Sequence, residues 1–168
     1  MIDFDNQGAL EIQREVVLLP RVPEGWTDEQ KSRLVEEEAG LVDFMNSFGH
    51  IANAGDAETL ISRYTDDATW RTARGHSVGK EQIKENYDGY YGPVHWFNYW
   101  TNIVVRFAKP FEEAYIAAYH YSLAVAEPDN FAVVSTDFWN LKRIDGEWKI
   151  YQRRIDLVQS HGHKLLPA

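Results

Sequence analysis

The chain has 168 residues, a length typical of one domain, and its 44% hydrophobic content is enough to build a core. Its formal net charge of −9, with no basic run, argues against a nucleic-acid backbone or an anionic membrane as its main partner. The absence of cysteine excludes disulfides and thiolate metal sites. We find no secretory signal and no apolar stretch long enough to span a membrane, so we expect a cytoplasmic protein.

Aromatic residues make up 14% of the chain, including six Trp and nine Tyr. Part of this content must fill the core. Buried Tyr and Trp side chains also need partners for their polar atoms, so such a chain often lines a pocket or an interface.

The first 26 residues are expected to form an arm, in which residues 11–19 are a short helix or remain extended before two prolines break the chain. Thr27 and Gln30 have the spacing of a capping box and predict the start of a long helix that ends near residue 54. Its apolar stripe consists of Leu34, Leu41, Met45, Phe48 and Ala52, with Asn53 at the edge.

Further along, we expect a short helix over 57–64, a strand over 68–73, a loop over 75–79 and a helix over 80–90. Long strands follow at 97–107, 114–126, 131–143 and 148–158. Asp145-Gly146 predicts a tight hairpin between the last two strands. Helices followed by a run of strands indicate an α+β domain over 27–158, with an antiparallel sheet curled over the helices and a tail over 159–168.

Asp137 is the first candidate for acid–base chemistry. Strand alternation places it on the same side as Ser135 and Trp139. A carboxylate facing apolar walls would be a usable general base. The alternative is an Asp on the outer face or at a subunit contact.

The two faces of the strand at 114–126 compete for the same role. Tyr115, Tyr119 and Tyr121 share one face, where their hydroxyls could donate to a substrate oxygen or their rings could simply fill the core. His120 lies on the opposite face and titrates in the useful range, although it could equally be a satisfied side chain at a subunit interface. A bulge or a one-residue shift would exchange the two faces.

One arginine of the last strand should point inward. Counting from Trp148 and Ile150 favours Arg154. A buried arginine could bind a substrate oxygen or form an ion pair with Asp137.

Several short segments, at 54–56, 64–70, 79–83, 101–105 and 145–150, occur in an order and spacing that resembles the SnoaL-like branch of the nuclear transport factor 2-like superfamily. The resemblance implies a cone-shaped α+β barrel, in which a curved sheet encloses a pocket closed by the long helix. It also implies a homo-oligomer, a dimer or trimer, and favours Arg153 as the inward arginine.

Lyases of this branch, such as scytalone dehydratase and lindane dehydrochlorinase, use an Asp at the end of the long helix and a His before the strand that carries the Thr-Asn pair. The matching positions here are Asn53 and Asn98. An amide does not titrate near neutral pH, so neither can be a general base, although both can hold a substrate oxygen.

The sequence therefore favours a cofactor-free lyase that eliminates water or a small fragment such as formaldehyde from a hydrophobic aromatic molecule. The candidates for catalysis are Asp137, His120, Tyr119, Tyr121 and Arg153, and those for substrate binding are Asn53, Asn98, Tyr115, Phe48, Trp100 and Trp139. No metal or cofactor motif is present. The alternatives are an isomerase or cyclase on a polyketide- or steroid-like substrate, and a binding or assembly module without catalysis.

Overall fold

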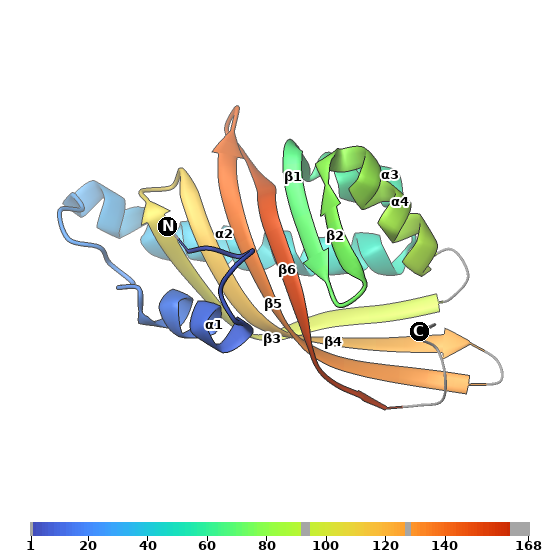
Figure 1. Ribbon diagram of the computed structural model, residues 1–168. Coiled ribbons are helices and arrows are strands. Elements are labelled where there is room, and N and C mark those ends of the chain that lie inside the picture. Colours follow the sequence, from blue (N-terminus) through green and yellow to red (C-terminus); the bar gives the residue numbers. More distant parts are fainter. Residues whose placement is uncertain (1, 92–94, 127–128, 162–168) are drawn as a thin grey trace.

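The computed structural model describes residues 2–91, 95–126 and 129–161 (Figure 1). The elements in chain order are α1 (Ala9–Leu18), α2 (Asp28–Asn53), α3 (Ala57–Ser62), β1 (Tyr64–Thr72), β2 (Gly75–Val78), α4 (Gly79–Tyr91), β3 (His95–Lys109), β4 (Glu113–Ala126), β5 (Asp129–Ile144) and β6 (Glu147–His161). No helix of the described ranges is both long and apolar enough to cross a membrane.

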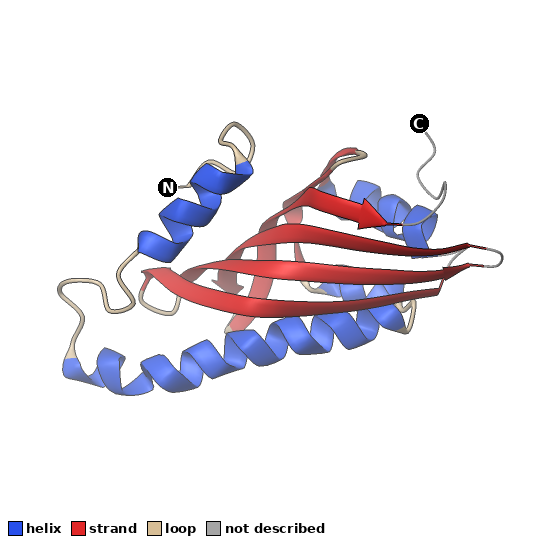
Figure 2. Ribbon diagram, turned by 90° about the horizontal axis from the view of Figure 1, so that it is seen from below, coloured by secondary structure: helices blue, strands red, loops and turns tan. Residues whose placement is uncertain are grey.

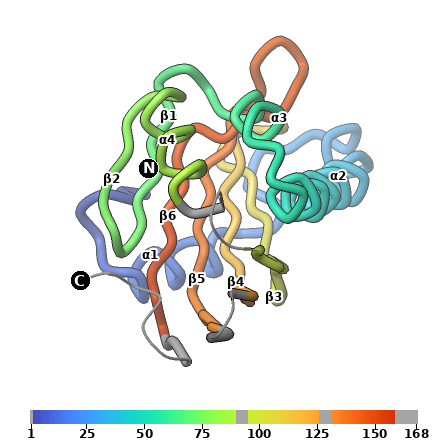
Figure 3. Tube along the Cα trace, turned by 90° about the vertical axis from the view of Figure 1, so that its right-hand side faces the viewer, coloured from blue at the N-terminus to red at the C-terminus, as the bar shows by residue number. Residues whose placement is uncertain are grey.

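The strands form one curved sheet in the order β2-β1-β6-β5-β4-β3. The sheet does not close on itself, and α2 runs along its concave side while α1 lies against the opposite side (Figures 2 and 3). The predicted α+β class is confirmed. The curved sheet is antiparallel as predicted at every pairing except one, since β1 pairs with β6 in parallel.

The long helix begins where the capping box predicts. Thr27 Oγ1 accepts a hydrogen bond from the Gln30 main-chain N at 3.2 Å, and Gln30 Oε1 accepts one from the Thr27 N at 2.8 Å. The predicted apolar stripe is the buried face of α2. Its central residues, Met45 and Phe48, lie in the main core between the helix and the sheet. The helix therefore forms a wall of the concave interior.

Several boundaries differ from the prediction. Strand β1 begins at Tyr64, four residues before the predicted start at 68, and the short helix before it ends at Ser62 rather than at 64. The segment predicted as a loop at 75–79 is strand β2, paired antiparallel with β1. Strand β6 continues to His161, past the predicted start of the tail at 159, and residues 162–168 lie outside the described residues. The hairpin prediction is confirmed, since Asp145 and Gly146 both have positive φ, 51° and 84°, as a type I′ turn requires.

A β-bulge in the last strand decides which arginine faces inward. Asn140 pairs with Gln152, but the next residue of β5 pairs with Ile150, so Tyr151 is an extra residue in the ladder. The extra residue puts Ile150 and Arg153 on the same concave face. Arg154 therefore points outward, and simple alternation from Trp148 fails at this point.

The N-terminal arm packs on the outer face of its own sheet. A second apolar cluster joins arm and sheet through Ile2, Phe4, Ile12, Val16, Tyr115, Ala117 and Phe138. Arg154 Nη1 donates hydrogen bonds to the main-chain oxygens of Phe4 at 2.8 Å and Gln7 at 2.6 Å. The outward arginine therefore holds the arm against the sheet.

We expect the arm to contribute to the stability of the domain. Ile12→Ala should lower the free energy of unfolding by about 2–5 kcal/mol, because Ile12 is fully buried and its removal leaves a cavity. Leu10→Ala, on the same helix but 82% exposed, should change stability by less than about 0.5 kcal/mol. Chemical denaturation of both variants gives the comparison, and equal midpoints would contradict the docked arm.

Candidate active site

Polar side chains from several elements converge on the concave face of the sheet. They come from α2, β1, the four long strands and α4, and are Asn53, Asn98, His120, Ser122, Ser135, Asp137, Arg153, Tyr64 and Tyr87. Strand register brings those of the sheet together, because Asn98 lies opposite Ser122 and His120 opposite Ser135. Buried polar groups need hydrogen-bond partners, and these residues supply them to one another.

His120 is the centre of one half of this network. Its ring stacks on Trp100 with centroids 4.8 Å apart and planes 16° from parallel. Nδ1 lies 3.1 Å from Ser135 Oγ, while Nε2 lies 3.1 Å from Asn98 Oδ1 and 3.0 Å from Ser122 Oγ. Both ring nitrogens are therefore engaged, and the imidazole has a fixed orientation.

The surroundings keep His120 uncharged at neutral pH. Burial lowers the pKa of His120 to about 4, and the positive charge of Arg153 adds to this effect while Asp137 opposes it. A neutral imidazole has one nitrogen with a free lone pair, so His120 is in the protonation state that can accept a proton.

Asn53 and Asn98 form a tight amide pair beside His120. Asn53 Oδ1 accepts hydrogen bonds from the Asn98 main-chain N at 2.7 Å and from Asn98 Nδ2 at 2.9 Å. Asn53 Nδ2 donates to the Asn98 main-chain O at 3.2 Å. The end of α2 is thereby joined to β3 at the edge of the network, where the Asn53 side chain is half-buried.

The second half of the network is a buried ion pair. Arg153 Nη2 lies 2.7 Å from Asp137 Oδ2, and Arg153 Nε lies 3.2 Å from each carboxylate oxygen. Trp100 Nε1 also donates to Asp137 Oδ2, at 2.8 Å. Arg153 Nη1 donates to the Tyr87 hydroxyl at 2.5 Å. The carboxylate of Asp137 is therefore enclosed by donors and has no exposed surface.

Aromatic faces surround the guanidinium of Arg153. Its Cζ lies 4.7 Å from the ring centroid of Trp139 and 5.0 Å from that of Phe48. Burial alone would lower the pKa of Arg153, but the opposing charge of Asp137, with Tyr87 and Tyr64, raises it well above its usual value. Arg153 is thus a permanent buried cation.

Gly49 allows Trp100 to reach this position. A Cβ atom at residue 49 would lie 2.6 Å from Cζ3 of Trp100, closer than real contacts allow. The indole can therefore lie against the backbone of α2 and still contact both His120 and Asp137. Trp100 is the link between the two halves of the network.

The structure separates some of the predicted site residues. Tyr119 and Tyr121 lie on the convex face, opposite His120: Tyr119 is 40% exposed, and Tyr121 stacks on Tyr99 with centroids 5.2 Å apart. Tyr115 is buried on that same face, in the cluster with the arm. The expectation that these tyrosines line the pocket was wrong, because α2 covers the face of His120 and Ala118. Asp137, Arg153, Asn53, Asn98, Phe48, Trp100 and Trp139 do come together on the concave side.

Sequence reasoning missed part of the network. Ser122 and Ser135 share strand faces with His120 and Asp137, and alternation alone could have included them. Tyr87 contacts the ion pair from α4, where it lies four residues after buried Ile83 on the same helical face. Nothing in the sequence indicated that this helix face meets Arg153.

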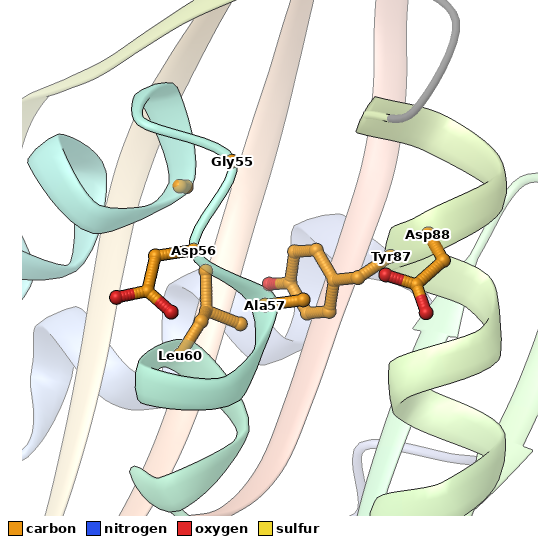
Figure 4. A pocket seen from close by; sticks show the side chains of 7 residues that line it. Gly55, Asp56, Ala57, Leu60, Tyr87 and Asp88 are labelled. Atoms are coloured by element: carbon orange, nitrogen blue, oxygen red, sulfur yellow. The ribbon is translucent and has the colours of Figure 1, made fainter.

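A cavity of about 90 Å³ lies between the end of α2, α3 and α4 (Figure 4). Its lining consists of Ala52, Gly55, Asp56, Ala57, Leu60, Tyr87 and Asp88. The Tyr87 ring borders this cavity, and its hydroxyl contacts Arg153 on the other side. Within the described ranges, no three His, Asp or Glu side chains converge as metal ligands would.

Solved structures with the same fold extend this picture. A candidate scytalone dehydratase from Novosphingobium aromaticivorans has a TM-score of 0.72 and 17% identity over 82% of this chain and 94% of its own. A hexachlorocyclohexane dehydrochlorinase, LinA-type3 from Novosphingobium barchaimii, has a TM-score of 0.69 and 16% identity over 83% and 97%. At these identities, the likeness establishes a shared fold.

A candidate aromatic ring hydroxylase from Novosphingobium aromaticivorans is a further structure of this kind, with a TM-score of 0.70 and 21% identity over 76% of this chain and 94% of its own. No curated protein sequence matches the chain. The SnoaL-like domain family matches residues 33–154, the greater part of the chain, in agreement with the resemblance seen in the sequence. The chain therefore belongs to the SnoaL-like domain family.

Proposed function

We propose that this protein is a cofactor-free lyase that acts on a hydrophobic aromatic small molecule, with His120 as the group that accepts the proton. The observation that carries the proposal is a neutral, oriented imidazole that is stacked on an aromatic ring within the buried polar network of the concave face. Membership of a family with lyase-type structural neighbours supports the reaction class.

His120 is a better candidate for the base than Asp137. The carboxylate of Asp137 already accepts hydrogen bonds from Arg153 and Trp100, and charge-assisted hydrogen bonds of this kind are strong. Substrate would have to displace these donors to reach it. We therefore assign Asp137 the role of holding Arg153 and Trp100 in place.

The proposed reaction is a simple elimination. The His120 imidazole takes a proton from a C–H bond of the substrate, and the electron pair of that bond forms a new double bond as the bond to the leaving group breaks. The imidazolium then returns the proton to the leaving oxygen, which departs as water or as an alcohol. The amides of Asn53 and Asn98 would hold the substrate oxygen near the leaving group.

The aromatic walls favour a ring-containing substrate. Trp100 stacks on His120, and Phe48 and Trp139 contact each other with centroids 4.9 Å apart. Aromatic rings pack edge-to-face or offset against such walls, gaining both buried area and preferred geometry. Arg153 would contribute its positive charge to any negative charge that develops on the substrate.

Replacement of His120 tests the catalytic role. His120→Gln should reduce turnover by at least about 100-fold, because general acid–base catalysis contributes roughly 10²–10⁴ in rate. The assay incubates the protein with a panel of phenols, aromatic diols and hydroxyketones and follows product formation by mass spectrometry. His50→Gln, on the exposed side of α2, is the matched control and should retain full turnover. Unchanged turnover in His120→Gln would remove His120 from the mechanism.

The mass of the product also separates this proposal from its alternatives. A lyase releases a product lighter than the substrate, whereas an isomerase or cyclase on a polyketide- or steroid-like molecule leaves the mass unchanged. The alternative of a binding module is favoured by one observation, the mutual satisfaction of the Asn53 and Asn98 amides. A binding module would leave every bound compound of the panel chemically unchanged.

The buried His120 should also make stability depend on pH. Its folded pKa, about 4, lies below the unfolded value of about 6.5, so the unfolded chain binds the extra proton first. The stability that the folded protein gains from keeping His120 neutral is fully present above pH 6.5. This part of the free energy of unfolding is lost as the pH falls toward 4. The loss should be on the order of 3 kcal/mol.

Denaturation of wild type and His120→Gln at pH 7 and pH 4.5 measures this contribution. The wild type should lose more stability than the variant over that interval, since only the wild type has the buried imidazole, which faces Arg153 and Asp137. Parallel losses in both proteins would show that His120 is not the buried neutral group.

We also propose that the protein self-associates through the part of the convex face that the arm leaves uncovered. Large apolar side chains with 39–50% exposure gather there on β3 and β4, namely Phe97, Tyr99, Tyr119, Leu123 and Val125. Strand pairing sets Phe97 beside Leu123 and Tyr99 beside Tyr121, so the side chains form one patch without an intervening charge. Contiguous apolar patches of this kind mark interaction surfaces.

Charge placed in the patch should dissociate the assembly. Tyr99→Asp combined with Leu123→Asp is expected to shift the mass measured by light scattering from that of a dimer or trimer to that of a monomer, because each carboxylate would be buried without a partner. Val35→Asp, on the exposed side of α2, is the control and should leave the mass unchanged. A monomeric wild type would refute the proposal outright.

A further inference from the structure

The orientation of the Asn53 amide is determined by main-chain atoms. Asn53 Nδ2 lies 3.2 Å from the main-chain O of Asn98, and Asn53 Oδ1 lies 2.7 Å from its main-chain N. A main-chain N–H can only donate and a carbonyl can only accept. The side-chain amide of Asn53 therefore has one possible orientation, which does not depend on any titratable group.

The second amide takes its orientation from the first. Asn53 Oδ1 also faces the side chain of Asn98 at 2.9 Å, and because an amide oxygen can only accept, Asn98 must present its Nδ2 there. Asn98 Oδ1 then points away from Asn53. It lies 2.5 Å from Ser122 Oγ and 3.1 Å from His120 Nε2.

The imidazole is the third group in this series. Asn98 Oδ1 can only accept, so the short contact with Ser122 uses the single hydroxyl proton of Ser122. Ser122 Oγ, 3.0 Å from His120 Nε2, is then left as an acceptor. Both neighbours of Nε2 therefore accept, so His120 carries a proton on Nε2. In a neutral ring the other nitrogen, Nδ1, then has the free lone pair. Nδ1 lies 3.1 Å from Ser135 Oγ, whose single hydroxyl proton can be donated to Nδ1 or to the main-chain O of His120 at 3.4 Å.

We infer that Asn53 and Asn98 are positioning residues that hold His120 as the Nε2–H tautomer, so that Nδ1 is the nitrogen that accepts the substrate proton. The catalytic part of this inference rests on the proposed function, whereas the tautomer itself does not. A carboxylate commonly fixes the tautomer of a catalytic histidine, and it also stabilises the imidazolium. The amide pair fixes the tautomer without adding a negative charge.

The tautomer is directly visible by NMR of protein labelled with ¹⁵N-histidine, because protonated and unprotonated ring nitrogens have different chemical shifts. The spectrum of His120→Gln identifies the His120 signals. At pH 7 we expect a protonated Nε2 and an unprotonated Nδ1 in the wild type. A proton on Nδ1 would overturn the inference, whatever the activity of the protein.

Two variants test the role of the amides. Asn53→Leu removes the amide that is oriented by the main-chain N–H and C=O of Asn98. The side-chain amide of Asn98 can then rotate, so the His120 signals should change from one tautomer to a mixture of both. Ser122→Ala removes a neighbour of the same oxygen without touching the Asn53 contact and should retain the single Nε2–H form. A single tautomer in Asn53→Leu would show that Asn53 does not direct it.

The same variants separate this inference from the proposed function. If His120→Gln keeps its turnover while the wild type has the Nε2–H tautomer, the proposed lyase role of His120 fails and the assignment of the tautomer stands. If turnover depends on His120 but the proton is on Nδ1, the role of the amides fails alone. Loss of turnover in Asn53→Leu, with the fold intact and the tautomers mixed, is the result expected if both hold.

Discussion

The buried pair of Asp137 and Arg153 constrains most of the interior. Charges removed from water are tolerated only when they are paired and hydrogen-bonded, and here every partner comes from a different element. Trp100 from β3 and Tyr87 from α4 complete the hydrogen bonds of the pair. The positions of these elements relative to β5 and β6 are therefore tied to one ion pair. Removing a single partner would leave a buried charge unsatisfied.

This constraint extends to His120. Trp100 donates its indole N–H to Asp137, and in the same position its ring is the surface on which His120 stacks. Gly49 makes room for the same ring on the side of α2. The site is thus supported by packed side chains and strands. The arm packs on the convex face, where Arg154 donates a hydrogen bond to its main chain. The arm takes no part in the polar network.

Much of this arrangement follows from local sequence patterns, and its limits have identifiable causes. The capping box at Thr27 and the turn at Asp145-Gly146 are local signals, and both were correct. The choice between Arg153 and Arg154 depends on the bulge at Tyr151, which comes from pairing with β5 and leaves no local trace. Which face of β4 looks inward depends on where α2 packs, so the tyrosines looked as suitable as His120. Contacts between residues far apart in the sequence determine which side chains point inward, and the periodicity of the sequence does not reveal these contacts.

The amide side chains of Asn53 and Asn98 have a clear physical consequence. Amides keep the hydrogen-bond geometry between the end of α2 and β3, as the contacts between Asn53 and Asn98 demonstrate. They supply neither a proton acceptor nor a negative charge. A neighbouring carboxylate would favour the imidazolium, whereas an amide oxygen leaves burial and Arg153 to keep the pKa of His120 low. In the proposed reaction, the base is therefore an imidazole that is unprotonated at neutral pH and holds an added proton weakly. Such a base suits a substrate whose own electron-withdrawing groups make its C–H bond acidic.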